Sequence, residues 1–258
     1  MSLNIVIPEV TALLEQLLSH ARDVLGYQFA GMYLYGSLAT GDFDPATSDI
    51  DFVVATHGEL SGEIVAALEA MHAEIAQREP KWGPKLEGAY IPLEALRRHD
   101  AATGEYPCVN EGAFYLAGLG SDWMIQRHVL RDHDARLAGP VLRDLIDPVA
   151  PESLRRSVCE TLREWWAPML EAPDPRMAGE EYRAYAVLSM CRALHTLETG
   201  EIASKRASAR WALETLDARW RPLIEQAAAW RPGAPMAGQD VTLEFMRWAL
   251  AGSRVEGA

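Results

Sequence analysis

The stretch that decides the fold is LYGSLATGDFDPATSDIDFVV, residues 34–54. Two short apolar runs, residues 32–35 and 50–54, flank a polar segment. Runs of this length and composition predict two neighbouring β-strands joined by a loop. Because side chains alternate along a strand, Asp49 and Asp51 are expected to project to the same side, several Å apart.

Two carboxylates held this close repel each other unless a cation lies between them. Mg²⁺ answers that need, since it takes one or two protein carboxylates together with substrate phosphates. At the end of the first run, Gly36 lets the backbone approach a ligand, and Ser37 offers a hydroxyl and an N–H to a phosphate. A turn that leads into a helix would add the anion-binding character of a helix N-terminus. Asp-x-Asp alone is more often a solvated loop, but the combination predicts a nucleotide–metal site.

Beyond this stretch, the chain changes character near residues 145–153, where two prolines three residues apart interrupt any helix. Before this point, we expect helices at 8–25, 60–78 and 121–138, strands at 31–35, 50–54 and 85–92, and an irregular segment at 99–120. After it, we expect only helices, at about 152–170, 180–199, 204–219, 221–230 and 240–252, with Trp211, Trp220, Trp230 and Trp248 in their core. The predicted fold is therefore α+β, with an α/β domain at 1–150 and a helical bundle at 151–258.

The spacing of Gly36-Ser37, eleven further residues and Asp49-Ile50-Asp51 resembles the signature of the DNA-polymerase-β-like nucleotidyltransferase superfamily. Three later stretches follow in the order seen in aminoglycoside (streptomycin/spectinomycin) adenylyltransferases: LEGAYI around Glu87, LAGPVLRDLIDPV at 137–149 and TGEIASK at 199–205. The resemblance covers most of the chain. It implies a nucleotidyltransferase domain with a small mixed sheet, followed by a helical domain, and the Mg²⁺-dependent transfer of AMP from ATP to a drug hydroxyl with release of pyrophosphate.

The resemblance also implies roles for individual residues. Asp49 and Asp51 would hold Mg²⁺, and Glu87 would deprotonate the attacking hydroxyl, which requires a carboxylate within hydrogen-bond reach of that proton. From the residues alone, Glu87 is as readily an exposed glutamate at the end of a strand, or a third metal ligand. The residues expected to line the triphosphate are Gly36, Ser37 and Ser48, with Arg192 and Lys205 from the helical domain.

Arg192 lies in the otherwise apolar segment VLSMCRALHTL, where a triphosphate or a structural glutamate would satisfy its charge. Lys205 follows TGEIAS and resembles the family lysine that reaches the ATP phosphates. Solvated basic residues on helix surfaces are the ordinary alternative for both. If both reach the nucleotide, its site lies between the two predicted domains.

The expected drug pocket is the least regular part of the resemblance. Streptomycin-modifying members use a tryptophan and an aspartate before the Arg192 helix, and Trp165 or Trp166 matches the tryptophan. The spacing within residues 163–185 differs, so the aspartate has no clear counterpart. The available acids are Glu171, Asp174, Glu180 and Glu181. An acidic loop with tryptophans packing the bundle is a competing interpretation, and streptomycin recognition is left open.

The amino-acid composition restricts the classes of partner that the protein is expected to bind. The 258 residues carry a formal net charge of −13, which disfavours long nucleic acid and favours a small cationic acceptor. No apolar run is long enough for a membrane span, and the N-terminal residues lack the pattern of a secretion signal. Three scattered cysteines indicate reduced thiols. We expect a cytoplasmic monomer.

Two alternatives stay open. A nucleotidyltransferase could act on another acceptor, such as a protein side chain, a tRNA end or another small hydroxylated molecule. A regulatory or antitoxin-like module could bind nucleotide without modifying any drug, although such a module would have no use for Glu87.

Overall fold

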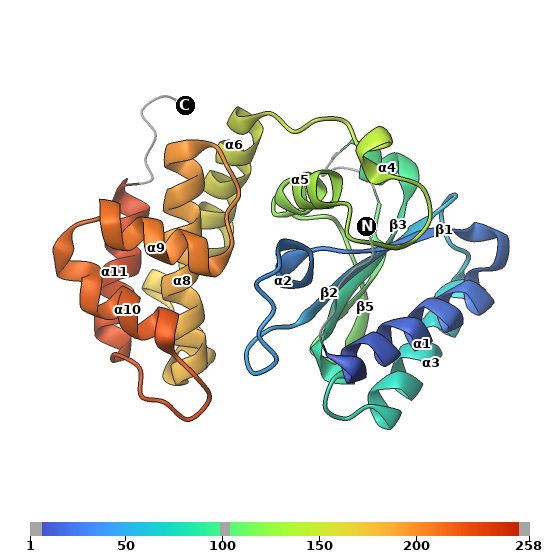
Figure 1. Ribbon diagram of the computed structural model, residues 1–258, viewed down its shortest axis with the longest axis horizontal. Helices are drawn as coiled ribbons and strands as arrows, with labels where there is room; N and C mark the ends of the chain where they lie inside the picture. The colour runs from blue at the N-terminus through green and yellow to red at the C-terminus, as the bar shows by residue number, and fades with distance from the viewer. Residues whose placement is uncertain (1–6, 99–103, 253–258) are drawn as a thin grey trace. The chain divides into compact units, whose positions relative to one another are not determined.

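The computed structural model of the chain describes residues 7–98 and 104–252. Its contacts divide the chain into two compact units. The α/β unit comprises residues 1–44 and 48–148, and the helical unit comprises residues 45–47 and 149–258 (Figure 1). The predicted α+β class is confirmed. The predicted domain bounds, 1–150 and 151–258, stay a prediction.

The α/β unit is built on a six-stranded mixed sheet with the strand order β5-β4-β3-β2-β1-β6. The strands are β1 (Phe29–Leu34), β2 (Ile50–Thr56), β3 (Leu86–Pro92), β4 (Tyr106–Asn110), β5 (Ala113–Ala117) and β6 (Arg136–Ala138). Only the pairing of β2 with β3 is parallel, and the other four pairings are antiparallel. The sheet thus brings the beginnings of β2 and β3 to the same edge as the end of β1.

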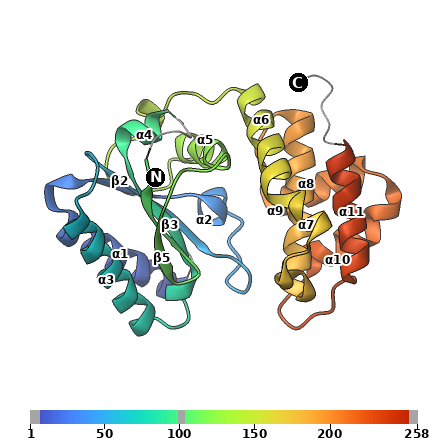
Figure 2. The ribbon, with the colours of Figure 1, turned by 180° about the vertical axis from the view of Figure 1, so that it is seen from behind.

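One face of the sheet is covered by α1 (Pro8–Leu25) and α3 (Gly62–Arg78), which lie side by side in both views (Figures 1 and 2). Apolar side chains of α1 at helical spacing pack against the even-numbered side chains of the strands, such as Phe52 and Val54. Ser61 caps α3 by accepting a hydrogen bond from the Ile64 N–H. Because strand side chains alternate, the odd-numbered side chains of β2 and β3 lie on the opposite face.

The opposite face carries α2 (Gly36–Thr40) and α5 (Trp123–His133), which contact each other. The Trp123 ring packs on the Tyr35 ring, with 6.0 Å between the centroids. Farther along α5, the buried Arg127 guanidinium donates to the carbonyl oxygens of Leu96, at 2.7 Å, and Arg97. These carbonyls belong to the short helix α4 (Leu93–Arg97), which directly follows β3. The start of α5 is thereby fixed against the sheet.

Two sequence predictions for this unit were wrong. The predicted irregular segment contains the hairpin of β4 and β5, although its residues 99–103 lie outside the described part. The hairpin turns through Glu111 and Gly112, both at positive φ, a geometry usually signalled by Asn-Gly or Asp-Gly. The helix predicted over 121–138 ends at His133, because Asp134 adopts φ +44°, and the next residues form β6 against β1.

The helical unit contains no strand within residues 149–252. Its helices are α6 (Pro151–Thr161), α7 (Pro168–Glu171), α8 (Glu180–Thr199), α9 (Lys205–Thr215), α10 (Arg221–Ala229) and α11 (Gln239–Gly252). Between α6 and α7, residues 162–166 form a π-helical turn. α8 packs against α6, α9, α10 and α11. Trp220 and Trp230 are buried, as predicted, whereas Trp211 and Trp248 are only half-buried. Across the described ranges, no helix combines the length and apolarity that crossing a membrane requires.

Candidate active site

Asp51 and Glu87 stand directly beside each other on adjacent parallel strands. They are register partners in the pairing of β2 with β3, so their side chains share one face of the sheet. Both residues are half-buried. The sheet therefore brings together the acid predicted to bind the metal and the acid predicted to act as base, although 35 residues separate them in the sequence.

Tyr35 lies next to Asp51 just beyond the end of β1, so the row of Asp51 and Glu87 continues toward a third strand. Its N–H donates to the Asp51 carbonyl at 3.2 Å, which places it opposite Asp51 just beyond the end of β1. The phenol is buried, and burial raises its pKa well above the ordinary value; the negative charges of Asp51, Glu87 and Asp122 raise the pKa further. Tyr35 thus stays neutral beneath a group of carboxylates.

Gly36 lies immediately against the Asp51 carboxylate. A Cβ at position 36 would overlap Oδ2 of Asp51 and would lie 2.5 Å from its Cγ. Gly36 also adopts φ +56°, a conformation that side chains other than glycine rarely take. The positive φ of the backbone and the contact with the Asp51 side chain therefore both favour glycine at position 36.

Ser37 follows Gly36 in the first turn of α2, whose leading N–H groups have no acceptor within the helix. Ser48 lies just before β2, and its hydroxyl accepts a hydrogen bond from the Asp44 N–H at 3.0 Å. The Lys85 ammonium donates to the Ser48 carbonyl at 3.2 Å. Asp49 is exposed and precedes β2 by one residue. The α/β unit thus supplies all six predicted site residues other than Arg192 and Lys205.

Within residues 7–98 and 104–252, no group of three or more His, Cys, Asp or Glu side chains could hold a metal ion. An all-protein metal cage is therefore not formed by the described residues. Two carboxylates that are completed by phosphate oxygens are the arrangement typical of Mg²⁺. This arrangement is the one that the sequence predicts for Asp49 and Asp51, and the roles of these two acids and of Glu87 stay predictions.

Three residues near Glu87 were missed by the sequence analysis: Cys108, Tyr115 and Asp122. The register pairs Cys108 with Ala89 of β3 on one side and with Tyr115 of β5 on the other. Burial, and then the charge of Asp122, raise the pKa of the Cys108 thiol to about 11, so it is not a reactive thiolate. A prediction of the β4–β5 hairpin would have indicated that Cys108 and Tyr115 lie near the site. No local sequence signal indicates Asp122.

In the helical unit, Lys205 begins α9 and its ammonium lies over the Tyr185 ring of α8, 5.1 Å from the centroid. Arg192 is half-buried and lies seven residues after Tyr185 on α8. Seven residues are close to two helical turns, so Tyr185 and Arg192 share a helix face. The structure thus places Arg192 and Lys205 on the same side of the helical unit.

The segment expected to recognise the drug is partly engaged in internal contacts. Trp166 is buried against Tyr185, with 5.7 Å between the ring centroids, whereas Trp165 is half exposed. Arg176 donates to both carboxylate oxygens of Asp174, at 3.1 and 2.9 Å, and these hydrogen bonds lower the pKa of Asp174. Trp165 and Trp166 therefore have different surroundings, and Asp174 already holds a guanidinium.

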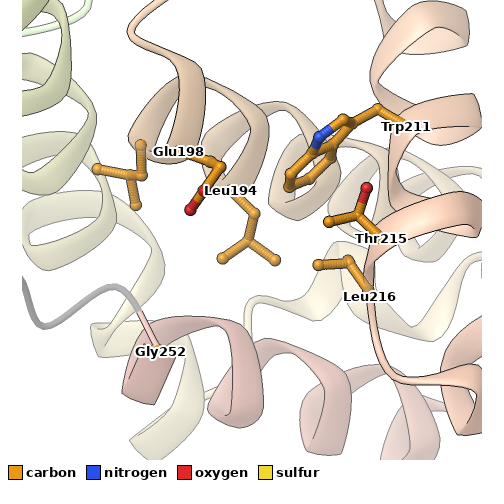
Figure 3. A pocket seen from close by; sticks show the side chains of 7 residues that line it. Leu194, Glu198, Trp211, Thr215, Leu216 and Gly252 are labelled. Atoms are coloured by element: carbon orange, nitrogen blue, oxygen red, sulfur yellow. The ribbon is translucent and has the colours of Figure 1, made fainter.

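A cavity of about 240 Å³ lies within the helical unit (Figure 3). Leu194, Leu197, Glu198, Trp211, Thr215, Leu216 and Gly252 line it. Glu198 and Trp211 face this cavity from α8 and α9, respectively. None of the predicted site residues lines it, so this cavity is distinct from the predicted chemistry.

Comparison with known proteins identifies two families. Residues 18–90 match the family described as nucleotidyltransferase domain, and residues 144–244 match the aminoglycoside adenylyltransferase C-terminal domain. The first match covers the segment that carries Gly36, Asp51 and Glu87. The second covers Arg192 and Lys205.

Curated relatives match nearly the whole chain. An aminoglycoside (3'') (9) adenylyltransferase of Shigella flexneri is 28% identical over 235 residues, which cover 86% of this chain and 85% of the relative. A spectinomycin 9-adenylyltransferase of Campylobacter jejuni is 28% identical over 232 residues. That match covers 82% of this chain and 81% of the relative. Among solved structures, a spectinomycin adenyltransferase from Enterococcus faecialis, crystallised with ATP and spectinomycin, superposes with a TM-score of 0.73 at 17% identity. That match covers 93% of this chain and 99% of the other, and it confirms the fold.

Proposed function

We infer the activity of this chain from one premise: it belongs to the aminoglycoside adenylyltransferase family, within the polymerase-β-like nucleotidyltransferase superfamily, and it is a nucleotidyltransferase enzyme. The proposed reaction is the transfer of AMP from ATP to a hydroxyl of an aminoglycoside or aminocyclitol, with release of pyrophosphate. The observation that supports it most is that Asp51 and Glu87 lie side by side on one face of the sheet, with Gly36 against the Asp51 carboxylate.

Glu87 is the proposed general base. It lies one strand beyond Asp51, so a hydroxyl beside Glu87 is also beside a phosphate bound at Asp51. Removing the proton of that hydroxyl as it attacks the α-phosphorus creates the new P–O bond while the bond to pyrophosphate breaks. Positioning and charge stabilisation carry most of the rate enhancement in phosphoryl and nucleotidyl transfer.

Gly36, Ser37 and Ser48 are proposed to bind the triphosphate. The Gly36 backbone can approach a phosphate closely because it has no Cβ, and Ser37 contributes an N–H and a hydroxyl. Ser48 contributes a hydroxyl, whose oxygen accepts the Asp44 N–H in the structure and which carries one hydrogen that can be donated.

Asp49 and Asp51 are the residues that would hold Mg²⁺. When bound, the ion would neutralise negative charge on the phosphates. Because Gly36 has no Cβ, no side-chain atom from position 36 occupies the space at the Asp51 carboxylate. That space is required if phosphate oxygens are to complete the coordination of the ion.

Arg192 and Lys205 are proposed to bind the ATP phosphates. Their common side of the helical unit supports the assignment, since two cations that approach one triphosphate must face the same way. Lys205 also rests on the Tyr185 ring, and this cation–π contact restricts its flexible side chain.

The acceptor is proposed to be a small, cationic, hydroxylated compound, and spectinomycin is expected to be a better acceptor than streptomycin. Streptomycin carries guanidinium groups that need free carboxylates. Of the acids expected near the drug, Asp174 in the loop before α8 is held by Arg176, and Glu180, the first residue of α8, pairs with Arg183 at 3.7 Å. Spectinomycin has no guanidinium group and does not depend on these acids.

The experiment that tests the proposal is to incubate the enzyme with ATP, Mg²⁺ and a panel containing spectinomycin, streptomycin and unrelated aminoglycosides, and to analyse each drug by mass spectrometry. A mass gain of one AMP on spectinomycin is the expected result. The Glu87→Gln variant is the matched control and should modify the drug at least about 100-fold more slowly. If the wild-type enzyme modifies none of the panel, the acceptor class is wrong, and AMP on a protein side chain would favour the alternative acceptor.

A further inference from the structure

The row of side chains that contains Asp51 and Glu87 continues beyond Glu87 toward the β5 edge of the sheet. On the face that carries Asp51 and Glu87, the register leads from Ala89 to Cys108 and from Cys108 to Tyr115. Ala89 and Cys108 are small and buried, whereas the Tyr115 side chain is 44% exposed. Tyr115 is therefore the first large, accessible side chain on this side of the base.

The geometry of the proposed reaction determines the side from which the acceptor approaches. In an in-line displacement, the attacking oxygen and the leaving group lie on opposite sides of the phosphorus. The proposed phosphate-binding residues Gly36 and Ser37 lie on the β1 side of Asp51, and Glu87 lies on the β3 side. The acceptor must therefore approach over β3, β4 and β5, and this inference rests on the proposed function.

Electrostatics places the Tyr115 phenol near the base. Burial raises its pKa, and the charges of Cys108, Glu87 and Asp122 raise the pKa further. Two strand spacings separate β3 from β5, which is roughly 10 Å. Tyr115 is in register with Ala89, two residues along β3 from Glu87, so roughly 12 Å separate the backbone positions of Glu87 and Tyr115. That distance accommodates one or two fused six-membered rings.

We propose that Tyr115 is an acceptor-positioning residue: its ring contacts the aminocyclitol and holds the reactive hydroxyl beside Glu87. A tyrosine ring offers apolar area to a sugar-like ring and a favourable face to an alkylammonium group. The carboxylate of Asp122, which is close enough to act on Tyr115, adds negative potential to the same place. Tyr115 therefore contributes to the affinity for the acceptor rather than to the affinity for ATP.

Leu116 supplies a matched control for this position. It is the next residue on β5, it is 50% exposed, and its side chain points to the opposite face of the sheet. Truncating Leu116 removes a comparable exposed side chain from the same edge strand without touching the site face.

The experiment compares Tyr115→Ala, Tyr115→Phe, Tyr115→Lys and Leu116→Ala in steady-state kinetics with the drug that the wild-type enzyme modifies. Tyr115→Ala should raise the KM for the drug about tenfold, the loss expected for one aromatic contact, and should leave the KM for ATP within about twofold. Tyr115→Phe and Leu116→Ala should stay within about threefold of wild type in both constants. Tyr115→Lys should weaken drug binding at least as much as Tyr115→Ala, because it places a cation against a cationic acceptor. Calorimetric titration of each variant with the drug gives the same comparison without turnover.

A drug KM that is unchanged in Tyr115→Ala and Tyr115→Lys overturns the proposal, and so does an equal rise in the KM for ATP. Melting temperatures of the variants identify any loss of folding, and Tyr115→Lys retains a long side chain should the alanine variant be unstable. A wild-type enzyme that modifies drugs while the Tyr115 variants behave normally contradicts this inference alone. A wild-type enzyme that modifies none of the drugs contradicts the proposed function and this inference with it.

Discussion

A carboxylate oxygen of Asp51 occupies the place that a Cβ at Gly36 would take. The contact joins the turn after β1 to the first residues of β2, the two segments that the proposed mechanism assigns to phosphate and to metal. The backbone of Asp51 is held in β2, which pairs on both sides, so an added Cβ would have to displace the carboxylate rather than the strand.

Replacing Gly36 with alanine should therefore disable the enzyme. The added methyl would displace the Asp51 carboxylate, and the backbone at φ +56° would add strain of about 1 kcal/mol. We expect binding of Mg²⁺-ATP, measured by calorimetry, to weaken at least about tenfold. Gly41→Ala is the control, since Gly41 has φ +79° but a Cβ added there would meet no atom within 4 Å. Equal losses in both variants would show that backbone strain, not displacement of Asp51, is responsible.

Variants of Asp51 and Glu87 should have different effects on ATP binding and on the rate of the chemical step. Glu87→Gln keeps the shape of the side chain but removes the base, so kcat should fall by about 10² to 10⁴ while ATP binding changes little. Asp51→Asn removes a charged metal ligand, so it should weaken Mg²⁺-ATP binding and also lower kcat. Rapid-quench kinetics and calorimetry on the two variants would test this difference. An active Asp51→Asn enzyme would contradict the metal assignment.

The central part of the fold was predictable from short-range patterns. The apolar runs around residues 32–35 and 50–54 predicted both strands, β1 and β2. The common side of Asp49 and Asp51 stays a prediction, because Asp49 precedes β2. The helical spacing of residues 8–25 matched α1 at both ends. These signals succeed because each depends on a period of two or of 3.6 residues within one element.

The hairpin of β4 and β5 and the neighbours of Glu87 were not predictable in the same way. Glu111 at φ +50° is a non-glycine residue in a turn that normally selects asparagine or aspartate, so the local chemistry gave no signal. Asp122 joins the site only because α5 is fixed through Trp123 and Arg127. Such tertiary contacts have no period that a single sequence can reveal.

Lys205 offers a test of the helical unit. Lys205→Ala should raise the KM for ATP about tenfold or more, because an ammonium group that contacts phosphate would be lost, and should leave the KM for the drug nearly unchanged. Arg210→Ala is a control on the same helix, since Arg210 is exposed and changes the net charge equally. The two variants compared at low and high salt distinguish a direct contact from a general field, because a general field would affect both alike and would be screened.

Stability should fall as the solution becomes more acidic, because of a histidine beneath the sheet. His72 is buried, stacks against Phe52 and shares a hydrogen bond of 2.8 Å with the Tyr90 hydroxyl. Burial lowers its pKa from 6.5 to about 4. The folded state thus keeps His72 neutral, whereas the unfolded chain protonates it below about pH 6.5. The contribution is complete above that pH and is lost as the pH falls toward the folded pKa.

Between pH 7.5 and pH 5, this group alone should lower the free energy of unfolding by about 2 kcal/mol, measured by urea denaturation at each pH. His72→Gln should lose most of this dependence, because its amide can still bond to Tyr90 but does not titrate. The informative quantity is the difference between the two proteins, since other titrating groups contribute equally to both. A wild-type protein and a His72→Gln variant with the same pH dependence would show that His72 is protonated in the folded state as readily as in the unfolded chain.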